Sequence, residues 1–186
     1  MILPNHYGVI LADPPWSYRN GGNGAAKNHY STMTADQIRY LSVGSMWVEE
    51  LAKPDAVLLL WATWPLLPEA MSVIGAWGFT YLTGMPWLKL SETPVVEQGD
   101  IINGKPTFGT GFWVRGCTEL ILIARKGKPR RPDTTFIGLL SERFAHSRKP
   151  DNLHQYAESL DGPYLELFAR RTRPGWTCWG DQIVQD

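Results

Sequence analysis

The sequence predicts an α/β fold in which a largely parallel sheet carries helices on both faces. Two short and almost uniformly apolar runs, Tyr7–Ala12 and Ala56–Ala62, have the composition of strands buried on both faces. Segments with helical spacing of apolar residues lie between the strand-like segments, so that strands and helices alternate. The 186 residues suffice for one full core, and we expect a single domain over residues 1–186.

Tyr7–Ala12 is the first predicted strand, and Asp13-Pro14-Pro15 ends it abruptly. A loop rich in glycine and asparagine follows over residues 17–33. The capping-box sequence Thr34–Gln37 predicts the start of a helix, and Gly44 is expected to divide the helical region into two pieces. The second piece has an apolar face made of Met46, Trp47, Val48 and Leu51.

After the strand Ala56–Ala62, a second helical region is predicted to run as far as Gly78. Its apolar positions recur at helical spacing and are Leu67, Ala70, Met71, Ile74 and Trp77. Phe79–Leu90 is the third predicted strand. The 23 residues 91–113 after it are rich in glycine, proline and threonine. Because loops of this length inside a domain are usually functional, we expect this one to contribute to substrate specificity.

The last third of the chain contains three predicted strands and one helix. Glu119–Arg125 is strand-like and is followed by a basic turn. Pro150 stands where a first helical residue is expected. The apolar stripe of this helix is Leu153, Tyr156, Ala157 and Leu160. Tyr164–Ala169 and Thr177–Trp179 complete the predicted strands.

Composition and charge narrow the class of protein. Lys+Arg and Asp+Glu both number 18, which excludes a histone-like tail or a polybasic membrane anchor. Residues 115–173 are the basic part, with 12 basic and 7 acidic side chains. Cys117 and Cys178 have no C-x-x-C partner, so neither a disulfide framework nor a zinc knuckle is expected. No apolar run approaches the ~18 residues of a membrane span, and we expect a soluble, cytoplasmic protein.

The segment Asp13-Pro14-Pro15-Trp16 carries the clearest chemical signal. It follows a buried strand, and α/β sheets bind ligands outside the carboxyl ends of their strands. The prolines stiffen the turn, so that the Asp13 carboxylate and the Pro14 carbonyl can present two acceptors to one pocket. Two acceptors would orient a primary amine such as N6 of adenine, and Trp16 offers a stacking face. A rigid turn with an exposed aspartate is the simpler alternative.

Further motifs follow DPPW in a fixed order. They are HYSTMT, LLLWAT, AWGFTY, GFWVRGCTELILIARKGKP, HSRKPD and YLELFARRTRPGWTCWGDQ. Together they resemble the bacterial and phage branch of the MT-A70-like methyltransferases, S-adenosylmethionine-dependent enzymes that methylate adenine N6. The resemblance spans Tyr7 to Gln182 and implies a Rossmann-like class I methyltransferase fold with permuted motif order. In that order the catalytic tetrapeptide is N-terminal and the cofactor-binding strand is C-terminal.

The resemblance implies that Asp13 and Pro14 hold the target amine and that Pro15 completes the catalytic turn with the tryptophan after it. It also implies substrate contacts by four aromatic residues, Trp16, Tyr30, Trp61 and Trp87. Packing in the core is the alternative for Trp61 and Trp87, because the nine tryptophans of the chain exceed what one site can use.

A cofactor site is expected where Lys149 directly precedes Pro150, because an ammonium and the free N–H groups of a first helical turn can converge on an anion. The family uses this lysine for the carboxylate of the cofactor. A solvated lysine at a helix start is the alternative.

The resemblance further implies that the cofactor is contacted by Asp13, Glu166, Arg170, Asp181 and Gln182. Glu166 lies in an otherwise apolar strand and needs a partner, for which Arg170 is the simplest candidate. Many relatives have asparagine where this chain has Asp181, which can accept from ribose hydroxyls but cannot donate.

Basic side chains gather in and after the strand Glu119–Arg125. Lys126, Lys128, Arg130 and Arg131 are candidates for contacts with backbone phosphates, and a solvated turn is the alternative. The Gly-rich residues 21–24 lack the G-K-[ST] ending of a phosphate loop and are expected to be the hinge of a lid. The four histidines have no metal-ligand spacing, and no metal is expected.

The sequence therefore predicts an enzyme that methylates N6 of adenine in DNA. Two alternatives stay open: the same reaction on RNA, and a catalytically silent nucleic-acid-binding subunit that pairs with an active relative. The intact DPPW tetrapeptide favours the active enzyme. Dimerisation on DNA is a further expectation, because one small domain offers little surface to read several base pairs.

Overall fold

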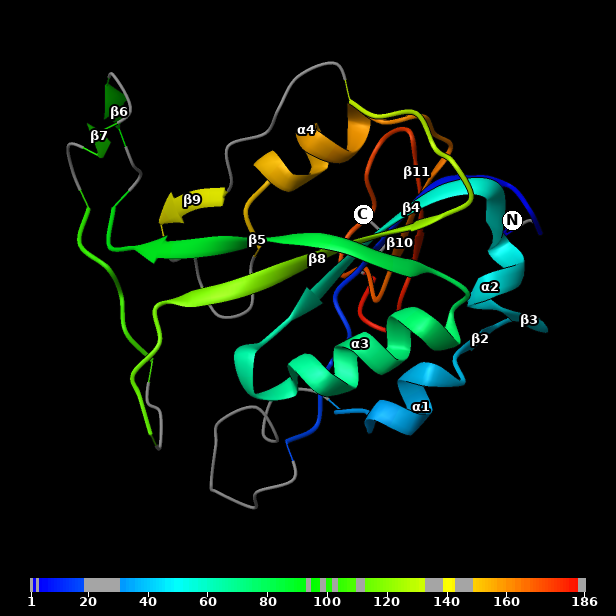
Figure 1. The fold of residues 1–186 in the computed structure, drawn as a ribbon, viewed down its shortest axis with the longest axis horizontal. Helices are drawn as coiled ribbons and strands as arrows, with labels where there is room; N and C mark the ends of the chain where they lie inside the picture. The colour runs from blue at the N-terminus through cyan, green and yellow to red at the C-terminus, as the bar shows by residue number, and fades with distance from the viewer. Residues whose placement is uncertain are drawn as a thin grey trace.

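The structure is a computed structural model and describes residues 2, 4–18, 31–92, 95–97, 100–101, 104–109, 113–132, 139–142 and 149–183. Its centre is a seven-stranded sheet with the strand order β11-β10-β1-β4-β8-β5-β9 (Figure 1). The strands are β1 (Tyr7–Ala12), β4 (Ala52–Ala62), β5 (Thr80–Leu90), β8 (Thr118–Lys126), β9 (Leu139–Glu142), β10 (Tyr164–Leu167) and β11 (Trp176–Trp179).

The helices are short. They are α1 (Ala35–Arg39), α2 (Val48–Leu51), α3 (Leu67–Ala76) and α4 (Asn152–Glu158), with a 3-10 turn at Trp64–Leu66. Two small ribbons pair β2 (Ser42–Val43) with β3 (Met46–Trp47) and β6 (Val96–Glu97) with β7 (Asp100–Ile101). In the part of the chain that the structure describes, no helix is long and apolar enough to cross a bilayer.

Strand direction decides which residues meet at each edge of the sheet. β1 is parallel to β10 and to β4, β10 is parallel to β11, and β5 is parallel to β9. β8 runs antiparallel to both of its neighbours, β4 and β5. The carboxyl ends of β1, β4, β5 and β10 therefore share one edge with the amino end of β8, and we call this edge the carboxyl edge.

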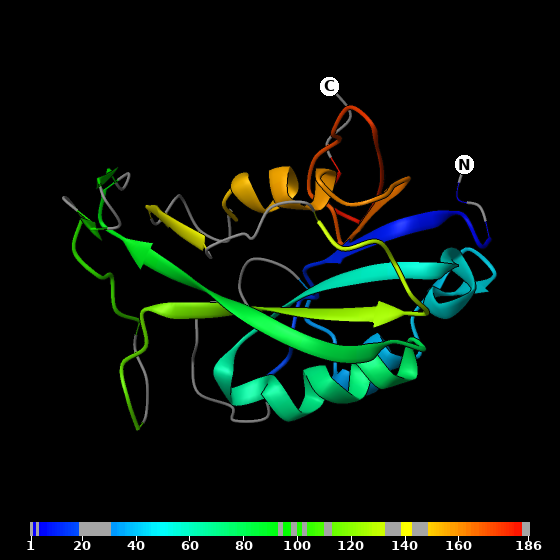
Figure 2. The ribbon, with the colours of Figure 1, turned by 45° about the horizontal axis from the view of Figure 1, so that its top comes forward.

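Each face of the sheet is buried under its own helices. Ile10 and Ala12 of β1 belong to the core beneath α1 and α3, whereas Val9 and Leu11 belong to a second core beneath α4. Figure 2 shows α3 and α4 on opposite sides of the sheet. Because both faces are covered, β1 and the Ala56–Ala62 part of β4 carry no charged side chain, and each large apolar side chain buried there contributes about 1.5–3 kcal/mol. The predicted α/β fold with helices on both faces is confirmed.

Most predicted elements are confirmed, with shifted ends. The capping box at Thr34 and Gln37 is formed, because each donates a backbone N–H to the other's side chain. The second helical piece is wrong in part, since Met46 and Trp47 lie in a ribbon strand and only α2 is helical. Gly44 turns this ribbon with φ +67°, a conformation that costs glycine little.

The predicted strand Tyr164–Ala169 ends two residues early. β10 stops at Leu167, and Phe168 adopts φ +62°, which is uncommon for a residue with a side chain. Such strain persists where the surrounding structure over-determines the backbone, often at functional sites. The change of direction at Phe168 lies at the carboxyl edge.

Candidate active site

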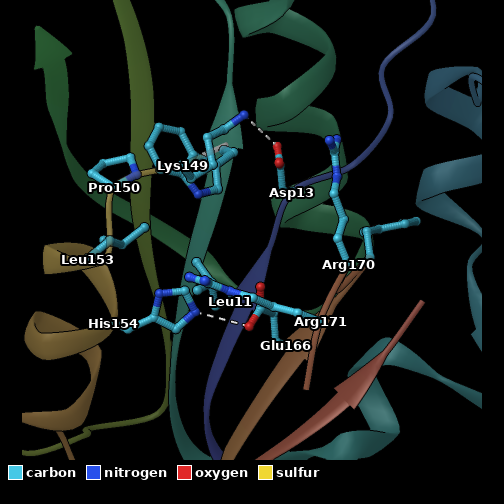
Figure 3. Close-up of a pocket in the computed structure, with 11 residues that line it drawn as sticks. Leu11, Asp13, Lys149, Pro150, Leu153, His154, Glu166, Arg170 and Arg171 are labelled. Atoms are coloured by element: carbon cyan, nitrogen blue, oxygen red, sulfur yellow. Dashed lines mark hydrogen bonds and ion pairs between the residues drawn. The ribbon is translucent and has the colours of Figure 1, made fainter. Parts of the chain in front are cut away.

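A cavity of about 280 Å³ opens at the carboxyl edge, between the ends of β1, β4 and β10 and the start of α4 (Figure 3). It is lined by Leu11, Asp13, Trp61, Lys149, Pro150, Leu153, His154, Glu166, Phe168, Arg170 and Arg171. Five of these were singled out from the sequence: Asp13, Trp61, Lys149, Glu166 and Arg170. The fold thus brings residues from both ends of the chain to one place.

The turn after β1 is held by hydrogen bonds on both of its sides. The Trp16 N–H donates to the Pro14 carbonyl at 2.8 Å, and the Trp16 indole N–H donates to the Trp61 carbonyl at 3.0 Å. Met33 donates its N–H to the Pro15 carbonyl and accepts from the Ser17 N–H. The Pro14 carbonyl has a second lone pair, so one acceptor position remains for a ligand.

Four charged side chains form an alternating row beside this turn. Lys149 Nζ lies 3.0 Å from Asp13 Oδ1 and 3.2 Å from Glu119 Oε2. Glu119 Oε1 also accepts from Lys89 Nζ at 2.5 Å. All four side chains are about four-fifths buried, and every charge faces the opposite sign. Lys149 uses two of its three N–H donors here, which leaves one for a ligand.

The row shifts the pKa values of its inner members. Burial alone would raise the pKa of Glu119, but the charges and hydrogen bonds of Lys149 and Lys89 outweigh it and hold that pKa below its usual value. Burial alone would lower the pKa of Lys149, but Asp13 and Glu119 outweigh it and hold that pKa above its usual value. Both groups are therefore charged at neutral pH.

The two predicted pocket tryptophans play different structural parts. Trp61 lines the cavity, and Lys149 Nζ lies 4.7 Å from the centre of its ring. Trp87 is 3 % exposed and packs edge-to-face on Trp61 with ring centres 5.7 Å apart. Trp87 is not among the cavity-lining residues, so it supports Trp61 from behind.

His154 and Glu166 form a pair inside the cavity, with 3.0 Å between Nε2 and Oε2 (Figure 3). His154 is 7 % exposed, and its other nitrogen, Nδ1, is buried without a hydrogen-bond partner. A buried nitrogen without a partner is costly and uncommon in native proteins. No role was predicted for this histidine, because its neighbours on the helix form an apolar stripe that indicates only a buried face.

The C-terminal motif residues are positioned by a close backbone approach. A Cβ on Gly180 would lie 2.2 Å from the Ala169 carbonyl oxygen, so only glycine fits beside the end of β10. Ala169 donates its N–H to the Trp179 carbonyl at 2.9 Å. Asp181 is exposed and Gln182 is half-buried, and neither lines the cavity. Their predicted contact with a cofactor stays a prediction.

Trp16 lies in the core beneath α1 and α3 and is 8 % exposed. It does not line the cavity, and little of its ring surface is exposed. Its predicted stacking on a base stays a prediction. Pro14 is buried and Pro15 half-buried, and both shape the turn. Tyr30 and the Gly-rich residues 21–24 lie outside the described residues.

The basic turn lies at the opposite edge of the sheet from Asp13. Lys126 pairs with Ala56 near the start of β4, which is about 20 Å of strand away from Ala62. The turn makes its own contacts there, since Lys126 Nζ donates to the Glu49 carbonyl and Arg130 pairs with Asp161. Lys128 donates its backbone N–H to Asp55, and Arg131 is exposed. The fold therefore does not bring the basic side chains of this turn to the cavity that contains Asp13.

Metal ligation finds no support in the part of the chain that the structure describes, where no group of three or more His, Cys, Asp or Glu side chains could hold an ion. The described residues that line the cavity supply two carboxylates, one ammonium, one imidazole, two guanidinium groups and aromatic surface.

Comparison with known sequences identifies similar proteins that cover nearly the whole chain. A family model described as MT-A70 matches residues 7–182. An N(6)-adenosine-methyltransferase MT-A70-like protein of Arabidopsis thaliana is 30% identical over 190 residues, which cover 98% of this chain and 24% of that protein. The N6-methyladenosine RNA methyltransferase MTA1 of Cryphonectria parasitica is 29% identical, with 96% of this chain and 52% of that protein covered.

A further relative is the type II methyltransferase M.MunI of a Mycoplasma species. It is 28% identical over 206 residues, which cover 95% of this chain and 78% of the relative. By contrast, this chain spans about a quarter of the length of the plant relatives that it matches.

Proposed function

Because this chain belongs to the MT-A70 family of N6-adenine methyltransferases, we propose that it transfers the methyl group of S-adenosylmethionine to N6 of adenine in DNA. The observation that carries the proposal is the position of the DPPW turn. It sets the Asp13 carboxylate at the cavity wall, 3.0 Å from Lys149, with the Pro14 carbonyl directly after it.

The cavity residues fit S-adenosylmethionine. Lys149 has one N–H donor left for a carboxylate, and the carboxylate of Glu166 can accept from hydroxyl or ammonium groups. His154 also lines the cavity, and its Nε2 holds the Glu166 carboxylate at 3.0 Å. Leu11, Leu153 and Phe168 supply apolar surface. When bound, S-adenosylmethionine supplies an electrophilic methyl group on a sulfonium sulfur.

The part played by Asp13 and Pro14 follows from the chemistry of an aromatic amine. The lone pair of adenine N6 is conjugated with the ring, and two acceptors that bind its two hydrogens favour the tetrahedral, nucleophilic form. The nitrogen forms the new N–C bond with that lone pair while the sulfur–carbon bond breaks and its electrons stay on sulfur. The nitrogen then becomes acidic and releases one proton, so Asp13 does not have to act as a strong base.

An adenine within a duplex reaches this turn only after it leaves the stack. Extrusion costs a few kcal/mol and is offset by aromatic contacts in the site. Trp61 and Phe168 are the aromatic side chains among the described residues that line the cavity.

DNA is proposed as the substrate because M.MunI matches this chain over 78% of its own length, more than the MTA1 protein does. RNA is the second candidate, since the relatives that are 30% identical are named as adenosine methyltransferases. A second copy of the chain is a proposed partner on duplex DNA.

The test is methyl transfer from labelled S-adenosylmethionine to duplex DNA, single-stranded DNA and RNA, read by nucleoside mass spectrometry. N6-methyladenine in DNA alone supports the proposal, and N6-methyladenine in RNA alone replaces it with the second candidate. Binding of cofactor and nucleic acid without any product points to a silent subunit.

Asp13→Ala and Asp13→Asn test the mechanism. We expect each to lower turnover by more than about 100-fold, as loss of an electrostatic contact to the reacting group does. Binding of S-adenosylmethionine, measured by calorimetry, persists. Asp161→Ala, at the far edge of the sheet, is the control and keeps full activity. Methylation at the wild-type rate by Asp13→Ala would remove Asp13 from the reaction.

A further inference from the structure

Trp64 is an exposed tryptophan at the carboxyl edge whose ring is fixed in place. It begins the 3-10 turn that follows β4 and is 55% exposed. Its indole N–H donates to Thr118 Oγ1, at the start of β8, with 2.8 Å between the two atoms. Pro65 comes directly after it and restricts the backbone of the turn. This side chain is not part of the hydrophobic core, but a hydrogen bond sets the orientation of its ring.

Two short paths join Trp64 to the proposed catalytic groups. On one side, Thr63 precedes it, and the hydroxyl of Thr63 accepts from the Tyr18 hydroxyl at 2.9 Å. Tyr18 stands two residues after the DPPW tetrapeptide and is 46% exposed. On the other side, Thr118 adjoins Glu119, which pairs with Lys149. Thr63 is therefore linked through Tyr18 to the segment after the DPPW turn, and Thr118 is linked through Glu119 to the row of charged side chains.

Trp64 also lies near the level of Asp13 at the carboxyl edge. β4 and β1 are parallel neighbours with Ala12 beside Leu60, so that Asp13 lies level with Trp61. Trp64 is three residues further along the chain, in the turn just past the end of β4, so only a few residues separate it from the level of Asp13 on the same edge of the sheet.

We propose that Trp64 is a stacking platform for a nucleobase that flanks the target adenine; the inference rests on the function proposed above. A base beside an extruded nucleotide has lost a stacking partner and exposes one face. A fixed indole offers a broad replacement surface at small entropic cost, because its orientation is set before binding. Stacking on an aromatic ring tolerates every base, so Trp64 contributes affinity and positioning rather than sequence reading.

The surroundings favour a base over a protein partner. The side chains that orient Trp64 and the adjoining Tyr18 are the hydroxyls of Thr118 and Thr63. Protein interfaces instead centre on apolar side chains that bury one another in a contiguous patch. Exposed aromatic rings on which bases stack are a common feature of proteins that bind single-stranded nucleic acid, and Trp64 and Tyr18 are two such rings near the active turn.

The experiment compares Trp64→Ala, Trp64→Phe and Trp47→Ala in binding to a labelled oligonucleotide with one target adenine. Trp47 is the matched control, because it is 53% exposed and lies on β3, away from the carboxyl edge. We expect Trp64→Ala to raise the Kd for the oligonucleotide about 5- to 150-fold. Trp64→Phe restores part of the loss, Trp47→Ala changes nothing, and the Kd for S-adenosylmethionine stays the same in all three.

An abasic nucleotide beside the target adenine identifies the partner of the ring. If Trp64 stacks on that base, the abasic oligonucleotide weakens binding by the wild type but hardly by Trp64→Ala, so that the two changes are not additive. Equal weakening of both proteins at every flanking position overturns the proposal. So does a Trp64→Ala variant that binds as tightly as Trp47→Ala. Thr118→Val keeps the indole but removes its acceptor, and a partial loss of affinity is expected from a folded protein.

The two proposals fail in different ways. Wild-type protein that binds the oligonucleotide but never methylates it contradicts the proposed function, while the Trp64 comparison is still measurable. If the wild type methylates adenine, and Trp64→Ala and Trp47→Ala have the same KM for the oligonucleotide, only the inference about Trp64 is contradicted.

Discussion

Glu119 shows how one buried carboxylate organises the charges of the site. It lies between Lys89 and Lys149, and Lys149 in turn reaches Asp13. Without Glu119, Lys149 would face Asp13 alone, and its ammonium would be free to neutralise the acceptor that the target amine needs. Glu119 therefore shares the ammonium group of Lys149 with Asp13.

The lowered pKa of Glu119 makes its contribution to stability dependent on pH. Because its pKa is lower in the folded than in the unfolded chain, its contribution is complete above the unfolded value near 4.5 and is lost as pH falls through the folded pKa. We expect Glu119→Gln to lower the free energy of unfolding by about 2 kcal/mol at pH 7, with the difference closing below pH ~4. Urea unfolding between pH 3 and 8 measures it.

Glu92→Gln is the control for this series, since Glu92 is an exposed glutamate just after β5. A constant difference between wild type and Glu119→Gln down to pH 3 would show that Glu119 acts through packing and not through its charge.

Asp13 and Lys149 could be predicted from sequence because each stands in a local motif whose chemistry can be interpreted without the fold. Glu119 and Lys89 could not. Glu119 was an ordinary polar position in the strand Glu119–Arg125, and only the direction of that strand brings it to Lys149. His154 was hidden by the apolar stripe around it, which predicts a buried helix face and not a partner for Glu166.

At the scale of elements, α4 is a short helix that depends on its contacts with β10. Leu153 and Ala157 pack into the core beneath it, and His154 reaches Glu166 on β10. Lys149 and Pro150 precede the helix directly, so its position sets where the ammonium lies.

We therefore expect His154→Ala to raise the KM for S-adenosylmethionine about tenfold and to leave kcat at saturation nearly unchanged, since a hydrogen bond to a charged group contributes about 1.5–3 kcal/mol. His154→Gln keeps a donor near the same place and restores most of the affinity. His6→Ala, near the amino end of β1, is the control. A fall in kcat with no change in KM would mean that His154 acts on the methyl transfer itself.

The short elements were the hardest to predict. Met46, Trp47, Val48 and Leu51 have helical spacing, but Gly44 at φ +67° reverses the chain, and Ser42 pairs with Trp47. Backbone pairing across a tight turn outweighed the periodicity, which four apolar residues cannot establish. The long apolar runs of β1 and β4 left no such choice, because a segment with no polar face must be buried on both sides.

At the scale of the whole molecule, the antiparallel strand β8 carries charged residues at both of its ends, and these two ends lie at opposite edges of the sheet. Its amino end supplies Glu119 to the site, and its carboxyl end carries Lys126 to the far edge. We predicted from the sequence that the basic turn contacts the substrate, because apolar periodicity does not reveal the direction of a strand. Six of the seven strands in this sheet were predicted from the sequence; β9 and the reversed direction of β8 were not.

This separation predicts that the basic turn contributes little to binding at the active site. We expect Arg130→Ala combined with Arg131→Ala to change the KM for DNA by less than twofold and to leave its salt dependence unaltered. Loss of two phosphate contacts would instead reduce the slope of log K against log salt by about 2, which would show that DNA extends to the far edge. Titration of KM against salt concentration distinguishes the outcomes.

Met33 closes the chain on itself at the base of the active turn, through its bonds to Pro15 and Ser17. The reacting turn is therefore held from two directions, by β1 before it and by the segment that leads into α1 after it. Met33 is thus a second anchor for the Asp13-Pro14 pair, although it lies 20 residues further along the chain than Asp13.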